Sequence, residues 1–568
     1  MNRRIIQVAA RKPGILAVLA IVVVLSLPSA NLDPVARADE PTWTSLFDGK
    51  SPPAAAPGGT LPLEDNSATF QDGVLHLVDR STAPGSTLLY KSLWNADPGG
   101  VSECEAEVKL IAASEGPCGM CLDVADGVHE DYLSLYPNGI GLWRAGLKYE
   151  MDTTSQFHTY RVRIAGSDIQ AFVDGTMVID GKGKFLYPAE NGRNECQFGA
   201  GSSPAAGEAL WRSMRLEIRR LAETRIAVPE IPGLDVEPGP TVVIQPNATY
   251  AAVFQFCDGR ISVGPGSYHP ASGKWSHDGG RTWQDGLAPP NNASIELGSG
   301  EILSLGFWTK KQPDGRYTLE QKRSLDGWKT VSAETGVFDI PRSVPCGGDA
   351  AETNDGFLMD HAVMRLADGR LMAAMYGNYD EDQTPADDYP ASYHFNKYRT
   401  IVVFSSDKGK TWGDPVAVAK NPKRGQEGYC EASLARRASG EILCAMRSGG
   451  SFGKFTPCYI SRSADEGQTW SEPQAILDRG VWPNLCVMPS GVIVCTTGRP
   501  GNWLVFSQDD GKTWQDGFCF YEGPTSSYNT VLQTGPDTVL VIYDRQAVSE
   551  QGVPRREIVG TPFKVKRR

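Results

Sequence analysis

An acidic and a basic side chain stand at the two ends of one predicted hairpin. Glu431 opens a predicted strand, Ser439-Gly440 forms a turn, and Arg447 closes the next strand. Because the turn brings the two strands together, both side chains can reach the same end of a sheet. A glutamate there can take up a proton, and a guanidinium can bind a carboxylate through two parallel hydrogen bonds. Glu427 competes for the acid–base role, and a solvent-facing strand end is the alternative for Glu431.

A second pair of titratable side chains begins another predicted strand. Asp360 and His361 are adjacent and precede the apolar run that ends at Asp368-Gly369-Arg370. A histidine beside an aspartate can act as an acid or a base near neutral pH. The alternative is a histidine that is simply hydrogen-bonded to a turn or to a neighbouring part of the sheet.

A turn that is repeated along the sequence predicts the strands that must position these residues. The frame S-x-D-x-G-x-T-W occurs at 276–283, 405–412, 463–470 and 507–514, with a worn fifth copy at 324–328. The Ser and Asp side chains can bind nearby backbone N–H groups, and the glycine accepts a positive φ. The Thr and Trp then begin a strand. We therefore expect the aspartates of the repeat to form turns and not to catalyse.

The spacing of the copies predicts a radial repeat. The copies begin at residues 276, 324, 405, 463 and 507, which fits one four-stranded sheet per copy with an insertion between the second and third. Such sheets form a β-propeller, with about six blades over residues 239–568. The pattern resembles the Asp box, or BNR repeat, of the sialidase (neuraminidase) superfamily, whose fold is a six-bladed propeller. Non-catalytic propellers carry the same box.

Residues 41–222 lack the box and alternate short apolar strands with turns, which predicts a β-sandwich. The run 157–175 resembles concanavalin-like jelly rolls of the laminin-G type. Leu46-Phe47-Asp48-Gly49-Lys50 resembles the start of a family of secreted bacterial jelly rolls that act on glycosides. Residues 223–238 are rich in proline and are predicted to be a linker. The predicted class is all-β, a six-bladed propeller preceded by a jelly-roll sandwich.

Composition and the N-terminus bear on the partners and the location of the protein. The chain has 568 residues and a net charge of −12, which disfavours nucleic acid and anionic membrane surfaces as partners. Residues 1–38 are predicted to be a signal peptide, with an uncleaved anchor as the alternative. The mature protein is then secreted or periplasmic, with no membrane association. The twelve cysteines are disulfides or buried thiols, and neither a metal site nor a cofactor is expected.

The resemblance to sialidases implies roles for particular residues. Tyr528 resembles the family's nucleophile, and Glu431 the base that takes its proton. Arg447 and Arg499 resemble two arginines of a carboxylate clamp, and Arg545 is placed on the same rim. A neutral phenol suits attack on a centre that bears a carboxylate, because a carboxylate nucleophile would be repelled. The alternative for Tyr528 is a tyrosine packed in a sheet.

The chain departs from the family pattern at two places. The stretch 247–254, where the family has its first arginine, contains none. The loop 264–270, where the family has its acid, contains no carboxylate. Asp360 or His361 is the expected substitute acid. The insertion 378–398 holds tyrosines, a histidine and four aspartates, and either caps a sugar site or is solvated surface.

These observations favour an exported, sialidase-like glycoside hydrolase that releases a terminal, acidic sugar from a glycan or glycoconjugate. Two alternatives remain open. In the first, the propeller binds carbohydrate without cleaving it. In the second, the jelly-roll module carries the hydrolase activity and the propeller positions it.

Overall fold

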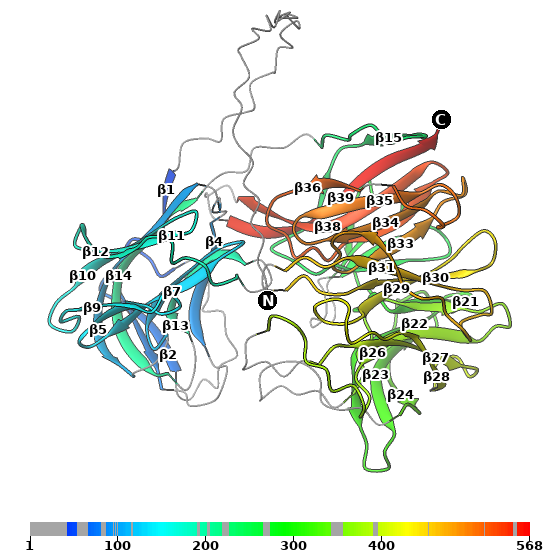
Figure 1. Cartoon of the computed structure of the whole chain (residues 1–568), viewed down its shortest axis with the longest axis horizontal. Coiled ribbons are helices and arrows are strands. Elements are labelled where there is room, and N and C mark those ends of the chain that lie inside the picture. The colour runs from blue at the N-terminus through cyan, green and yellow to red at the C-terminus, as the bar shows by residue number, and fades with distance from the viewer. Residues whose placement is uncertain are drawn as a thin grey trace, which may run out of the picture. The chain divides into compact units, whose positions relative to one another are not determined.

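The computed structural model describes residues 42–568, with gaps at 54–65, 81–86, 95, 97, 99, 115–117, 190–192, 202–204, 219–225, 265–272, 342–355, 390–395, 452–453, 516 and 549–553. All regular elements in the described residues are β-strands, and none is a helix. The expected all-β class is therefore confirmed (Figure 1). The predicted signal peptide, 1–38, lies outside the described residues. Within them, no helix is available that is long and apolar enough to cross a bilayer.

The first region consists of two antiparallel sheets around one hydrophobic core. One sheet has the order β12-β11-β10-β5-β14-β3-β2, with β1 beside β14, and the other has the order β4-β13-β6-β7-β8-β9. The strands are β1 (Thr42–Phe47), β2 (Asn66–Gln71), β3 (Val74–Asp79), β4 (Leu88–Leu93), β5 (Val101–Ala113), β6 (Cys121–Asp126), β7 (Glu130–Tyr136), β8 (Gly139–Leu142), β9 (Leu147–Glu150), β10 (His158–Ala165), β11 (Asp168–Val173), β12 (Thr176–Gly181), β13 (Asn194–Ala200) and β14 (Gly207–Ile218).

Strand β5 explains why this region forms a sandwich. Cys104, Ala106, Val108 and Leu110 are all buried, and the residues between them are only partly so. Because successive side chains of a strand point to opposite faces, one face of β5 is apolar and packs on the core. The two-sheet arrangement agrees with the predicted sandwich, and the jelly-roll resemblance stays a prediction.

The second region repeats one simple unit, a four-stranded antiparallel sheet built in chain order. The units are β17–β20, β21–β24, β25–β28, β29–β32 and β33–β36, and the second and third are joined by a parallel pairing of β24 with β28. The strands are β17 (Ala252–Gln255), β18 (Ile261–Gly264), β19 (Gly273–Ser276), β20 (Gln284–Gly286), β21 (Ser294–Gly298), β22 (Glu301–Lys311), β23 (Tyr317–Ser324), β24 (Ser332–Phe338), β25 (Val363–Arg365), β26 (Leu371–Gly377), β27 (Arg399–Ser405), β28 (Thr411–Ala419), β29 (Cys430–Arg436), β30 (Ile442–Arg447), β31 (Cys458–Ser463), β32 (Gln474–Leu477), β33 (Asn484–Val487), β34 (Ile493–Gly498), β35 (Asn502–Ser507) and β36 (Phe518–Tyr521).

The last sheet takes its strands from both ends of this region. β37 (Thr530–Gly535), β38 (Thr538–Val548) and β39 (Pro554–Arg567) pair in order, and β15 (Leu234–Pro238) and β16 (Val242–Pro246) pair with β39. The prediction of a linker over 223–238 is therefore wrong for residues 234–238, which form strand β15. A proline is tolerated at the end of this edge strand, where its missing N–H breaks no ladder. Leu234 is buried in the same core as Phe563, so this pairing ties the start of the region to its end.

The repeated turns close on themselves, as expected. In the copy that begins at Ser405, the Asp407 carboxylate accepts the Thr411 hydroxyl at 2.6 Å and the Thr411 N–H at 2.9 Å. Ser405 Oγ accepts the Gly409 N–H at 2.8 Å, and Trp412 Nε1 donates to the Gly409 carbonyl at 3.1 Å. The Thr-to-Asp bond is also 2.6 Å in the copies at 276–283, 463–470 and 507–514. Each carboxylate is thus occupied within its own turn.

The fifth copy is more complete than its sequence suggested. Thr330 Oγ1 donates to Asp326 at 2.7 Å, and the Trp328 N–H donates to Ser324 Oγ at 2.9 Å. Trp328 therefore occupies the glycine position of the frame, with a φ of 72°. Its buried side chain packs with Phe254, which pins the unusual backbone conformation.

Every described cysteine is a free thiol, and most are buried. Of the two expectations for the cysteines, buried thiols describe this part of the chain. Cys444 and Cys495, for example, lie in apolar cores. The described residues include no cluster of three or more His, Cys, Asp or Glu side chains arranged to hold a metal ion.

Candidate active site

The hairpin of β29 and β30 brings Glu431 and Arg447 together, as the sequence predicted. The strands pair at Cys430 and Arg447, and the register then shifts before Ser433 pairs with Ala445. Glu431 sits in this bulge with a φ of 45°, a conformation that is rare for a glutamate and that clusters at functional sites. Its carboxylate is buried and lies 2.6 Å from the guanidinium of Arg447. The solvent-facing alternative for Glu431 is therefore wrong.

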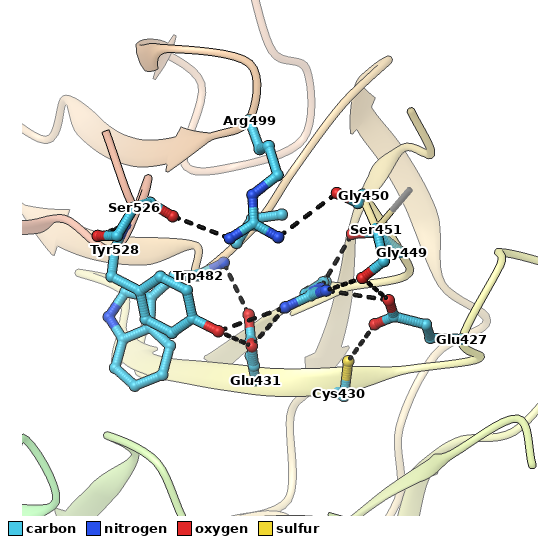
Figure 2. A network of polar contacts seen from close by, with 12 residues as sticks. Glu427, Cys430, Glu431, Gly449, Gly450, Ser451, Trp482, Arg499, Ser526 and Tyr528 are labelled. Carbon is cyan, nitrogen blue, oxygen red and sulfur yellow. Dashed lines mark hydrogen bonds and ion pairs between the residues drawn. The ribbon is translucent and has the colours of Figure 1, made fainter. Parts of the chain in front are cut away.

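Tyr528, in the segment between β36 and β37, joins this pair. Its hydroxyl donates to Glu431 Oε1 at 2.7 Å, and the Trp482 N–H donates to Oε2 at 3.0 Å (Figure 2). The half-buried phenol ring lies 5.0 Å from the ring of Tyr250 and 4.4 Å from that of Trp482, centroid to centroid. Tyr528 is thus not merely a packed sheet residue, because its hydroxyl is directed at a buried carboxylate.

The protonation state of Tyr528 follows from its surroundings. Burial raises the pKa of the Tyr528 phenol well above its ordinary value; the charge of Glu431 raises it further, and Arg447 and Arg499 oppose this. The phenol is therefore neutral and acts as the hydrogen-bond donor. Attack by its oxygen on a carbon centre would release the proton along the existing bond to Glu431, which is the relation of a nucleophile to its base.

Arg447 does not act as the free carboxylate clamp that the sequence suggested. Its donors contact Glu427, Glu431, Gly449, Ser451 and Tyr528 at 2.6–3.5 Å. A guanidinium has five N–H groups, and these contacts use all of them. The clamp role is therefore wrong for Arg447, which instead neutralises the two buried glutamates that flank it.

Glu427, the competing candidate for the base, is fully engaged elsewhere. It accepts hydrogen bonds from Ser451 Oγ at 2.6 Å and from the Tyr389 hydroxyl at 2.5 Å, and its ion pair with Arg447 measures 3.0 Å. Although burial acts in the opposite direction, Arg447 and these bonds lower the pKa of Glu427 below its ordinary value. Because Tyr389 belongs to the insertion 378–398, this insertion reaches the site and is not only solvated surface.

Arg499 is the arginine that keeps unshared donors. It follows β34 and is 8% exposed. Its Nη2 donates to the Ser526 carbonyl at 2.9 Å and its Nη1 to the Gly450 carbonyl at 3.4 Å, while its buried Nε has no partner. Among the described residues, no ion pair joins Arg499 to a carboxylate, so its expected role in substrate binding stays a prediction.

Arg545 was expected on the same rim, and the structure places it elsewhere. It pairs with Glu557 of the neighbouring strand β39 at 3.0 Å. Because side chains alternate along β38, Arg545 and the preceding Asp544 point to opposite faces. Asp544, and not Arg545, faces the segment that carries Tyr528. The prediction for Arg545 is therefore wrong.

Asp544 is a residue that the sequence analysis did not select. Its carboxylate is fully buried and accepts the Thr249 hydroxyl at 2.9 Å, the Ser526 N–H at 3.1 Å and the Ser526 hydroxyl. Arg556 Nη1 lies 3.0 Å from it. Asp544 thus ties the segment of Tyr250 to the segment of Tyr528. The available signal was an aspartate that ends the apolar run Val539-Leu540-Val541-Ile542-Tyr543.

Of the two side chains expected to act as the acid, Asp360 is suitable and His361 is not. Asp360 is buried, and neither carboxylate oxygen makes a hydrogen bond of ordinary length and angle, although the Tyr376 side chain is close enough to act as a weak donor. Burial, and then the charge of Glu431, raise the pKa of Asp360 well above its ordinary value, with opposition from Arg447 and Tyr376. A carboxyl group whose pKa is raised by burial tends to keep its proton, which suits a general acid.

His361 cannot take that role at neutral pH. Its Nε2 contacts the Pro483 carbonyl at 2.9 Å, and its ring stacks on Trp482 with centroids 4.4 Å apart. Burial lowers the pKa of His361 to about 4, so the ring is neutral and its Nε2–H is already donated. The prediction of His361 as an acid is wrong, and the alternative of a hydrogen-bonded structural histidine is correct.

Asp360→Asn is expected to lower kcat by about 10²–10⁴-fold and to raise stability. The folded-state pKa of Asp360 is raised, so its contribution to stability is present at low pH and is lost as pH rises toward that pKa. The gain in melting temperature for the variant should therefore be larger near pH 8 than near about pH 5. Wild-type activity should fall on the alkaline side for the same reason. Asp285→Asn, at an exposed carboxylate, is the control; a gain that shrinks as pH rises would contradict the assignment.

The comparisons with known proteins agree with the repeat. Residues 308–541 match the family model described as a BNR repeat-like domain. This match to a BNR repeat agrees with the Asp boxes that the sequence shows in the same region. No curated protein matches the chain.

Several solved structures resemble the chain in outline. A protein of unknown function from Dyadobacter fermentans is 20% identical, with 59% of this chain and 100% of that chain covered and a TM-score of 0.44. An α-L-arabinofuranosidase from Fusarium graminearum is 16% identical, with 58% and 98% covered and a TM-score of 0.41. A Hadza microbial sialidase is 14% identical, with 90% and 98% covered and a TM-score of 0.39. These likenesses carry no argument about the reaction, which rests on the site itself.

Proposed function

We propose that the protein is an exported glycoside hydrolase whose active centre lies where β29, β30 and the segment of Tyr528 meet. The six successive sheets of residues 234–568 are taken as the blades of one propeller. The observation that carries the proposal is the 2.7 Å hydrogen bond from the Tyr528 hydroxyl to Glu431, which Arg447 and the Trp482 N–H hold in place.

In the proposed reaction, Tyr528 Oη attacks the anomeric carbon of a terminal sugar while its proton passes to Glu431. Asp360 gives its proton to the glycosidic oxygen, so the aglycone leaves as a neutral alcohol. Water then attacks the sugar–tyrosine bond, Asp360 takes a proton from that water, and Glu431 returns one to Tyr528. The raised pKa of Asp360 and the hydrogen bond from the Tyr528 hydroxyl to Glu431 support this division of roles.

The proposed reaction does not by itself decide whether the substrate sugar is acidic or neutral. An acidic sugar was expected because two arginines were available to bind its carboxylate. Arg447 has no donor left, so that expectation rests on Arg499 alone. The glycan or glycoconjugate substrate and the secreted or periplasmic location are parts of the same proposal.

The proposal is tested by incubating the wild-type protein with fluorogenic glycosides, both neutral and acidic, and measuring release of the fluorophore. Release from at least one glycoside, with loss of release in Glu431→Gln, is the expected result. Binding of glycans without release from any of these substrates would favour the alternative of a carbohydrate-binding propeller.

A further inference from the structure

Tyr250 is the exposed member of an aromatic row beside the proposed nucleophile. Its ring meets that of Tyr528 edge to face, at 5.0 Å and 78°. The row continues through Trp482 to His361, with centroid separations of 4.4 Å at each contact. Tyr250 is 46% exposed, whereas Trp482 is 8% exposed. Tyr250 is therefore the member of the row with the most surface left for a ligand.

The backbone at Tyr250 is strained, and the surrounding structure holds it. Its φ is 55°, in the left-handed region that a tyrosine seldom adopts. The hydroxyl of Thr249 is anchored on Asp544 at 2.9 Å, and the carbonyl of Ala251 accepts from the Asn292 amide at 3.2 Å. A strained residue that its neighbours fix on both sides points to a functional role for its side chain. The anchoring aspartate is also the one that fixes Ser526, close to Tyr528.

The charges around the row leave little attraction for another anion. Arg447 is shared between Glu427 and Glu431, and Arg556 is paired with Asp544 at 3.0 Å. Arg499 donates to two backbone carbonyls and, of these three arginines, is the one without a carboxylate partner among the described residues. A substrate carboxylate would have this single guanidinium as its counter-ion in a site that already holds three buried carboxylates, so its desolvation would be only partly compensated.

We infer that Tyr250 selects the sugar, and that the sugar bound against it is uncharged, with an apolar ring face packed on the tyrosine. The inference rests on the proposed function, because it concerns the substrate of the same site. An aromatic wall supplies apolar contact, and neighbouring polar groups orient the hydroxyls, which is the usual composition of a small-molecule site.

The test compares wild type with Tyr250→Ala, Tyr250→Phe and Tyr250→Arg. The substrates are 4-methylumbelliferyl glycosides of neutral pentoses and hexoses, of glucuronic acid and of N-acetylneuraminic acid. We expect neutral glycosides to be cleaved with the higher kcat/KM. Tyr250→Ala should raise KM about tenfold with a smaller change in kcat, and Tyr250→Phe, which keeps the ring, should raise KM less than Tyr250→Ala does. Tyr250→Arg should shift the preference toward the acidic glycosides.

Two results would overturn the inference: a higher kcat/KM on an acidic glycoside, or an unchanged KM in Tyr250→Ala. If the wild type cleaves none of the probes, the proposed function fails, and the inference is then decided by binding alone. Saturation-transfer NMR with methyl glycosides of the same sugars should show neutral sugars bound by wild type and lost in Tyr250→Ala. Preferential binding of the acidic sugars, or binding that does not depend on Tyr250, would contradict it.

Discussion

Tyr528→Phe is expected to reduce turnover on the order of 10⁴-fold or more while leaving the protein folded. The substitution removes only the hydroxyl that donates to Glu431 at 2.7 Å, and the ring keeps its contacts with Tyr250 and Trp482. Glu431 keeps two partners, Arg447 and the Trp482 N–H. The chemistry therefore loses its nucleophile, whereas the packing is preserved.

The measurement is the rate of release from whichever fluorogenic glycoside the wild type cleaves fastest, together with the melting temperature. Tyr160→Phe is the matched control, because Tyr160 lies in the sandwich core and its hydroxyl has no hydrogen-bond partner. It should keep full activity. If Tyr528→Phe is as active as wild type, the Tyr528 assignment fails, and the alternative in which the sandwich carries the hydrolase gains support.

Arg447→Met is expected to cost about 3–5 kcal/mol of unfolding free energy at neutral pH. Arg447 is 6% exposed and neutralises Glu427 and Glu431, which are 4% exposed each. Without it, two buried carboxylates lose their counter-ion, and burial then raises their pKa values. The variant should recover stability as pH falls and the carboxylates take up protons.

The pH dependence separates this effect from a simple loss of packing. In the wild type the pKa of Glu427 is lowered, so its contribution to stability is lost as pH falls through that pKa. Wild type and Arg447→Met should therefore respond to acid in opposite directions in urea denaturation. Arg316→Met, which breaks an exposed ion pair, should change stability by less than about 1 kcal/mol. A loss in Arg447→Met that is the same at every pH would contradict the charge argument.

Much of the site was predictable because its residues follow a repeated turn. Each Asp box is held by bonds between residues at most four positions apart, as in Ser405 to Gly409. Local hydrogen bonds of this kind can be predicted from a sequence, and their spacing predicted the order of the sheets. From that order, Glu431 and Tyr528 were expected on different sheets that face the same site. The hairpin that joins Glu431 to Arg447 was also predictable, because its turn lies between them.

The errors concern properties that depend on distant partners. Arg447 was expected to be a free clamp, and its donors are consumed by residues of two loops and of Tyr528's segment. Arg545 was preferred to Asp544, although only strand alternation and the position of Ser526 show which of the two faces the site. Burial lowers the pKa of His361, and the ring nitrogen Nε2 is held by the Pro483 carbonyl, 122 positions away.

The sequence by itself determined the all-β class and the repeated sheets, because turn chemistry and strand alternation are local, and its resemblance to sialidases suggested the proposed nucleophile and base. Only the tertiary structure decided which side chains are charged and which donors remain free. Both depend on burial and on contacts between remote segments, such as the bond from Thr249 to Asp544 that sets Tyr250 beside Tyr528. The absence of an arginine at 247–254 was visible in the sequence. That Tyr250, in the same stretch, contacts Tyr528 is known only from the fold.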